Sequence, residues 1–202
     1  GQLAAGERIP VIKSEQAQVL TARAYTAPQV ALIAAAQTPR HGLATELAYA
    51  AGLRAHELLT LRRGEERAAD PRPALASKWQ GRNGVIYTVH GKGGLVREVL
   101  LPHALAERLE AVRLDAPLAI TDRGIHYQSH YDIGGGQRWS NSVSAASERA
   151  LGWSTGAHGL RHSYAQERMA ELQASLSRDA ALTTVSQEMG HFRPEITETY
   201  LR

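Results

Sequence analysis

The sequence predicts a mainly α domain with one small antiparallel β-sheet, an α+β fold. Apolar residues recur at three- and four-residue spacing over most of residues 26–62 and 139–200, which is the period of amphipathic helices. Between these regions, the runs VIYTVH and LVREVLLP are separated by GKGG, a pattern typical of a hairpin with a glycine-rich turn. A chain of 202 residues has the length of a single domain.

The domain is expected to span residues 26–202. Residues 1–25 show no sustained period, so we interpret them as an arm or the remnant of a linker.

Three helical stretches are expected before the hairpin. The first begins near Thr26, which can cap it, and Pro28 suits its first turn. The second covers GLATELAYAA and stops at Gly52. AHELLTLR then predicts a further helix after a turn that carries Arg54.

After the hairpin, ALAERLEAVRL predicts a short amphipathic helix, whereas residues 116–137 show no period and are expected to include a long loop. The last third is expected to hold four helices. The first runs from Trp139 to Leu151, the second begins directly after His158, and the third is stopped by Gly190. The fourth begins at Pro194 and carries Ile196 and Tyr200 on one face.

Composition narrows the kind of protein. The formal net charge is +3, the pI is near 9.4 and arginine outnumbers lysine, which favours an anionic partner. Cysteine is missing, which excludes disulfides, thiolate nucleophiles and cysteine-ligated zinc. No apolar run reaches membrane length and GQLAAGERIPVIKSEQ has no signal-peptide core, so we expect a soluble cytoplasmic protein that does not enter membranes.

Polar residues that folding alone does not require lie in the stretches GLRAHEL, GKGG, HGLRH and GHFRPEITETY. A tyrosine hydroxyl has a pKa of about 10, so Tyr200 needs an acceptor or a positive field before it can attack. Two arginines, Arg54 and Arg161, can supply that field, and their planar forks match phosphate oxygens, so they can replace a metal in phosphoryl transfer. Lys92 could protonate a leaving oxygen, and nearby histidines could move protons.

A metal site is the competing reading of the paired histidines. His158 and His162 have the i,i+4 spacing that zinc can use, but the acidic residue of the HExxH pattern is missing and no third ligand is indicated. We therefore expect neither a metal nor another cofactor.

In order and local context, these stretches resemble the catalytic domain of tyrosine recombinases, the phage-integrase family. GLRAHELLTLR is similar to the family's first arginine motif, HGKGGLVREVLLP to its lysine hairpin, HGLRHSYA to its His-x-x-Arg box, and MGH, with a tyrosine nine residues beyond the histidine, to its closing motif. The resemblance covers residues 26–202 and implies that family's catalytic-domain fold. Because only about 25 residues precede the pattern, the family's N-terminal DNA-gripping domain is expected to be absent.

The resemblance implies a site-specific recombinase or integrase of a phage or an integrative mobile element. Tyr200 would attack double-stranded DNA and form a 3′-phosphotyrosine link, which a 5′-hydroxyl of a second strand would reverse. The other implied roles are a phosphate clamp for Arg54 and Arg161, protonation of the leaving oxygen by Lys92, help with proton transfer by His158, and a hydrogen bond to the phosphate from His191.

Supporting roles are implied as well. Glu57 would orient Arg54 or a neighbouring histidine, and His162 lies next to the His-x-x-Arg box. The expected assembly is a tetramer on DNA and a monomer in isolation, associated with the nucleoid when bound. Candidate contacts to the DNA backbone are Arg62, Arg63, Arg82 and Arg138.

One spacing departs from the family pattern. Arg161 and His191 lie 30 positions apart, and LQASLSRDAALTT is expected to hold an insertion as an exposed loop or an extended helix.

Three alternatives stay open. A type IB topoisomerase would use similar arginine, lysine, histidine and tyrosine chemistry. A DNA-binding regulator could keep the fold without turnover. In a purely structural reading, Tyr200 would pack with Ile196 against the core.

Overall fold

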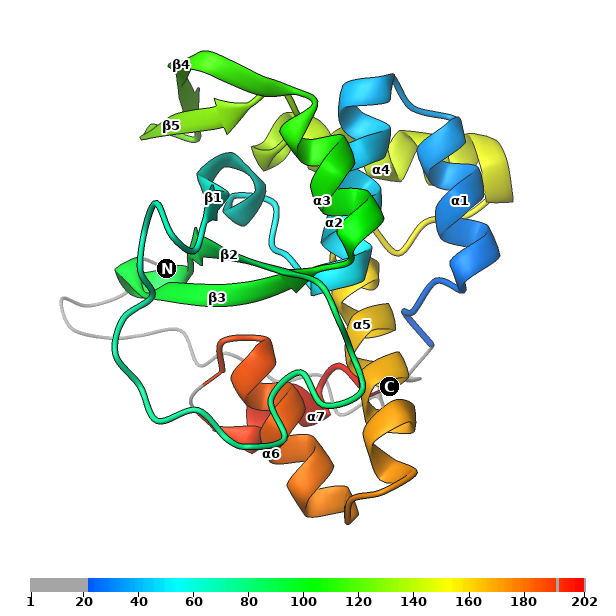
Figure 1. Cartoon of the computed structure of the whole chain (residues 1–202). Coiled ribbons are helices and arrows are strands. Elements are labelled where there is room, and N and C mark those ends of the chain that lie inside the picture. Colours follow the sequence, from blue (N-terminus) through cyan, green and yellow to red (C-terminus); the bar gives the residue numbers. More distant parts are fainter. Residues whose placement is uncertain (1–21, 192, 202) are drawn as a thin grey trace, which may run out of the picture.

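The computed structural model describes residues 22–191 and 193–201, and for Lys92 it describes the backbone only. Most of the predicted N-terminal arm therefore lies outside the described residues. Figure 1 shows helices surrounding a small antiparallel sheet, with a second hairpin at one edge of the molecule. The predicted α+β class is confirmed.

The first two helices lie where the sequence places them. Helix α1 (Ala27–Ala35) has a capping box, in which Thr26 Oγ1 accepts from the Gln29 amide and the Gln29 side chain accepts from the Thr26 amide. Helix α2 (Pro39–Ala51) ends at Gly52, whose φ of 60° is the left-handed conformation that glycine adopts without strain.

The prediction of a helix in AHELLTLR is wrong. This stretch forms one 3-10 turn, η1 (Glu57–Thr60), and then the short strand β1 (Arg62–Arg63). Leu58, Leu59 and Leu61 are all buried, so no single helical face could hold them.

The predicted hairpin is confirmed as β2 (Val85–His90) and β3 (Val96–Leu101), joined through η2 (Lys92–Gly94). The strands pair from Val85 with Leu101 to His90 with Val96, and β1 adds to the other edge of β2, so the strand order is β1-β2-β3. This register sends alternate side chains of β3 into the core.

The prediction of a long loop in residues 116–137 is also wrong for most of this range. After α3 (His103–Glu110), the chain forms an antiparallel hairpin of β4 (Arg113–Asp122) and β5 (Ile125–Tyr131). Most of β4 is exposed on both faces, so its residues show no apolar alternation that would reveal a strand.

The last third is helical, as predicted. Its helices are α4 (Gly136–Leu151), α5 (His158–Gln173), α6 (Arg178–Glu188) and α7 (Pro194–Glu198). LQASLSRDAALTT forms the end of α5, a short turn and the start of α6.

Tyr200 does not lie on α7, contrary to the expected i,i+4 pair with Ile196. The helix ends at Glu198, and the Tyr200 amide closes a turn onto the Thr197 carbonyl at 2.9 Å. Ile196 is 39% exposed whereas Tyr200 is 8% exposed, so the two side chains do not share one buried face.

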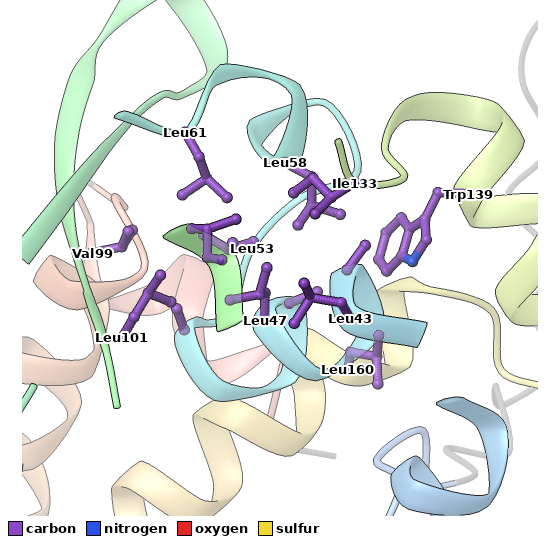
Figure 2. Close-up of a cluster of buried hydrophobic side chains, with 14 of the residues drawn as sticks. Leu43, Leu47, Leu53, Leu58, Leu61, Val99, Leu101, Ile133, Trp139 and Leu160 are labelled. Atoms are coloured by element: carbon purple, nitrogen blue, oxygen red, sulfur yellow. The ribbon is translucent and has the colours of Figure 1, made fainter. Parts of the chain in front are cut away.

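Two apolar clusters support the fold, and α5 contributes to both. The larger one joins α2, η1, β3 and α4, and Figure 2 shows Leu47, Leu53 and Trp139 among its members. The smaller one packs α5 against α6 and includes Tyr164 and Tyr200. Because Leu160 belongs to the first cluster and Tyr164 to the second, α5 carries the residues between them to the junction of the two.

Candidate active site

Side chains from four separated segments meet at the start of α5. Arg54 comes from the loop after α2, His158, Arg161 and His162 come from α5, His191 follows α6, and Tyr200 follows α7. The structure thus brings these six predicted residues together.

Arg161 is the centre of this arrangement, with only 1% of the residue exposed. Its Nη1 donates to the carbonyl of Gly52, the cap of α2, and its Nη2 donates to the Met189 carbonyl at 3.4 Å. The guanidinium carbon lies 5.2 Å from the centre of the Tyr200 ring. Burial and the neighbouring charge of Arg54 lower the pKa of Arg161 to about 10, so it stays a cation at neutral pH.

Arg54 is aligned by a buried carboxylate. Glu57 accepts from the Arg54 amide at 2.8 Å and from Arg54 Nη1 at 2.9 Å. Burial alone would raise the pKa of Glu57, but Arg97, Arg161 and Arg54 together lower it well below its usual range. Glu57 is therefore ionised and holds Arg54, whose side chain is 21% exposed.

His191 faces Arg161 in a defined tautomer. Nη2 of Arg161 lies 3.1 Å from Nε2 of His191, and the other ring nitrogen, Nδ1, lies 2.7 Å from Thr197 Oγ1. A guanidinium can only donate, so Nε2 must accept and Nδ1 must carry the proton. Burial, followed by the charges of Arg161 and Arg54, lowers the pKa of His191 to about 3, in agreement with a neutral ring.

Tyr200 lies among three histidines. Its ring centre is 5.1 Å from that of His158, 4.9 Å from that of His162 and 5.3 Å from that of His191, against which it stacks at 26°. Desolvation and then the charge of Arg161 lower the pKa of His158 to about 4. His158 and His191 are thus neutral near pH 7 and able to accept a proton.

His162 holds the backbone of the tyrosine. Its Nδ1 lies 3.2 Å from the Tyr200 carbonyl, to which Gln166 Nε2 also donates at 3.3 Å. The first two turns of α5 therefore supply both a neighbour of the phenol ring and an anchor for its main chain.

The remaining predicted residues are Lys92 and the four candidate DNA contacts. The backbone of Lys92 is in η2 at the end of the hairpin, and its side chain lies outside the description. Arg63 pairs with Glu65 and Glu110, and Arg82 donates from Nε and Nη2 to the two carboxylate oxygens of Glu171. Arg62 is partly buried and Arg138 is exposed.

Sequence reasoning missed Arg97, which is 6% exposed and donates to both carboxylate oxygens of Glu57. A signal for it exists. In the alternating strand VREVLL, Arg97 shares a face with Val99 and Leu101, and a charge on the apolar face of a strand needs a buried partner.

Residues 22–191 and 193–201 lack both a metal site and a membrane-spanning helix. No group of three or more histidine, cysteine or acidic residues is placed to hold a metal ion. No helix in these ranges combines the length and the apolarity needed to cross a bilayer.

Known structures of tyrosine recombinases share this fold. The XerH site-specific recombinase in a post-cleavage complex is 18% identical, with a TM-score of 0.55, over 89% of this chain and 49% of that chain. The XerA recombinase is 14% identical, with a TM-score of 0.58, over 97% and 64%. The Tn1549 transposon integrase in complex with a circular intermediate DNA is 14% identical, with a TM-score of 0.53, over 93% and 63%.

No protein-family model and no curated protein sequence matches the chain. The structural likeness shows that the chain has the fold of a tyrosine recombinase catalytic domain. The chain spans between about half and two thirds of the length of these solved structures.

Proposed function

We propose that residues 26–202 are the catalytic domain of a site-specific DNA recombinase that cleaves and rejoins double-stranded DNA through a 3′-phosphotyrosine intermediate. We further propose that it serves a phage or an integrative mobile element and acts as a tetramer on DNA. The observation that carries the proposal is the position of Tyr200, which lies against the Arg161 guanidinium and beside neutral histidines.

In the proposed reaction, the Tyr200 oxygen attacks the phosphorus of a phosphodiester, and the bond from phosphorus to the 5′-oxygen breaks. The phenol proton passes to His158, whose ring is the exposed member of the histidine group. Lys92 supplies a proton to the leaving 5′-oxygen. The reverse attack by a 5′-hydroxyl restores a phosphodiester, so no external energy source is needed.

The arginines would stabilise the phosphate. Arg161 Nε is buried and has no hydrogen-bond partner among the described residues, and Arg54 keeps donors beyond those that Glu57 occupies. A phosphate oxygen is the acceptor that such forks match best, and the negative charge that develops in the transition state would strengthen the interaction. His191 would donate to the phosphate from Nε2 once the phosphate displaces its contact with Arg161. For this the ring proton must move from Nδ1 to Nε2, and Thr197 Oγ1 must then donate to Nδ1.

The test is covalent trapping on a pool of nicked duplexes with a randomised central sequence. We expect the full chain to form a DNA adduct that survives denaturation, blocks the 3′ end and is lost in Tyr200→Phe. Sequencing the trapped strands gives the preferred site. Tyr127→Phe, a change on β5, is the matched control and should trap as wild type does.

Other outcomes separate the alternatives. An adduct that persists in Tyr200→Phe would show that another residue is the nucleophile. DNA binding without any adduct would favour a non-catalytic DNA-binding protein, and relaxation of supercoiled DNA without strand exchange would favour a topoisomerase. EDTA should leave the adduct unchanged, because the arginine clamp takes the place of a metal.

A further inference from the structure

Arg97 makes three hydrogen bonds next to the candidate active site, two with Glu57 and one with the Glu188 carbonyl. Its Nε and Nη2 donate to the two carboxylate oxygens of Glu57 at 3.2 and 2.7 Å, and its Nη1 donates to the Glu188 carbonyl at 2.8 Å. With Arg54, it gives the Glu57 carboxylate four hydrogen bonds. Glu57 is fully buried, so its position is fixed by these donors rather than by solvent.

The contact with Glu57 controls the direction of Arg54. Each oxygen of the Glu57 carboxylate accepts one hydrogen bond from Arg54 and one from Arg97, so a shift of Glu57 would turn the Arg54 guanidinium. An arginine fork is the group that can hold both oxygens of a carboxylate in one plane; a lysine ammonium is a point charge and cannot.

The third contact of Arg97, with the Glu188 carbonyl, connects it to the segment that precedes His191. Arg97 and Arg161 donate to successive carbonyls at the end of α6, those of Glu188 and Met189. Gly190 follows with a φ of 73°, and a Cβ built on it would lie 2.5 Å from Arg97 Cδ. The turn that leads into His191 is therefore packed directly on the Arg97 side chain.

Stability alone does not explain this arrangement. A buried ion pair gives little net stabilisation compared with apolar residues of the same volume, because both charges lose their hydration. The contacts of Arg97 do give a fixed geometry between two segments that are far apart in the sequence, Arg54 with Glu57 and the turn before His191.

We propose that Arg97 is a positioning residue for the cleavage reaction: it orients Arg54 through Glu57 and holds the turn that carries His191, without touching the phosphate. This inference rests on the proposed function.

The first variant is Arg97→Lys, assayed on the DNA site selected by trapping and on the same DNA with a methylphosphonate at the cleaved position. Replacing one non-bridging oxygen by methyl removes the negative charge that the arginine clamp neutralises. We expect cleavage of the natural phosphate to slow by up to about 100-fold, because a misplacement of about 1 Å in a group that positions the reaction can cost that much. On the methylphosphonate, the cleavage rate of Arg97→Lys should be less than about 3-fold below that of wild type, because the negative charge that Arg54 stabilises is absent from this substrate.

Arg168→Lys is the matched control. Arg168 is as buried as Arg97 and is ion-paired, but its hydrogen bonds go to Glu188, Glu171 and the Gln80 carbonyl. Its replacement should lower thermal stability and change cleavage of both substrates by the same factor. DNA affinity should stay within about 2-fold of wild type in both variants, since neither side chain reaches the exposed surface.

If Arg97→Lys does not fold, Glu57→Gln with Arg97→Met removes the buried ion pair as a unit, so that the Glu57 carboxylate is not left without its Arg97 partner. This double variant should still cleave the natural phosphate slowly, because Arg54 has lost its ionised partner. Wild-type rates in the double variant, no loss in Arg97→Lys, or an equal loss on both substrates would each overturn the positioning role. A wild-type chain that forms no Tyr200 adduct on any substrate would instead overturn the proposed function, and this inference with it.

Discussion

Arg161 connects three parts of the chain through one side chain. Its two terminal nitrogens bind the cap of α2, the end of α6 and the ring of His191, and its face covers Tyr200. A residue in this position has both a structural role and a proposed catalytic one, and the choice of replacement decides which of them is measured.

Arg161→Lys keeps a positive charge but removes the fork. We expect the free energy of unfolding to fall by about 1–3 kcal/mol, because buried carbonyls lose their donor. Cleavage should fall to background, since one ammonium cannot serve two phosphate oxygens. Urea denaturation and single-turnover cleavage measure the two effects. Cleavage by the lysine variant at the wild-type rate would remove Arg161 from the clamp.

The histidines give a pH dependence with a defined sign. The pKa of His158 is about 4 in the folded chain against about 6.5 in an unfolded one. Between these values the unfolded chain binds a proton that the folded chain does not, so the free energy of unfolding falls as the pH falls through this window. His158→Gln should therefore lose less thermal stability than wild type between about pH 7 and pH 5. The difference should be modest, because the ring is partly exposed, and an equal loss in both proteins would contradict the lowered pKa.

The site residues differ in how visible they are in the sequence. Arg54, Arg161 and His191 stand in motifs, and the structure brings them together as the order of those motifs suggests. Arg97 is a charge on the apolar face of its strand, which indicates a buried partner but does not identify it, because Glu57 is 40 positions away. Pairing over such a separation depends on the register of the hairpin, which no local pattern states.

At the scale of elements, helices and strands with one buried face could be predicted. The hairpin of β2 and β3 and the helices α1, α2 and α4 to α6 fit that description. The hairpin of β4 and β5 could not be predicted, because Leu118 and Ile125 are exposed and the strands carry no core face over most of their length. The turn that joins these strands has positive φ at Arg123 and Gly124. In the sequence, the glycine at position 124 is the one feature that indicates this turn.

The glycines that end α2 and α4 give a matched pair of substitutions that test stability. Gly52 and Gly152 both end a helix in the left-handed conformation. A Cβ on Gly152 meets nothing within 4 Å, so Gly152→Ala should cost about 1 kcal/mol of backbone strain. A Cβ on Gly52 would lie 2.9 Å from the Tyr164 ring, so Gly52→Ala should cost about 1–3 kcal/mol more. Urea denaturation compares the two, and equal costs would mean that the ring moves aside freely.

At the scale of the whole molecule, the proposed function predicts how DNA binding responds to salt. Each lost phosphate contact should reduce the slope of log affinity against log salt by about 1. Arg138 is exposed, whereas the Arg82 fork is occupied by Glu171. Arg138→Gln should therefore reduce the slope by about 1, and Arg82→Gln should leave it nearly unchanged. Fluorescence anisotropy over a salt series tests this, and equal slopes for the two variants would mean that the pair with Glu171 opens on DNA.

The way the chain enters the domain has a mechanical consequence. Tyr25 is 2% exposed and is fastened to α5, where its amide donates to Ser163 Oγ at 2.8 Å and its carbonyl accepts from the same hydroxyl. Its ring stacks on Trp153 at 5.3 Å. Ser163 directly follows His162 and lies two positions after Arg161. A tensile load applied to the backbone ahead of Tyr25 therefore reaches the helix that carries the site before it reaches α1.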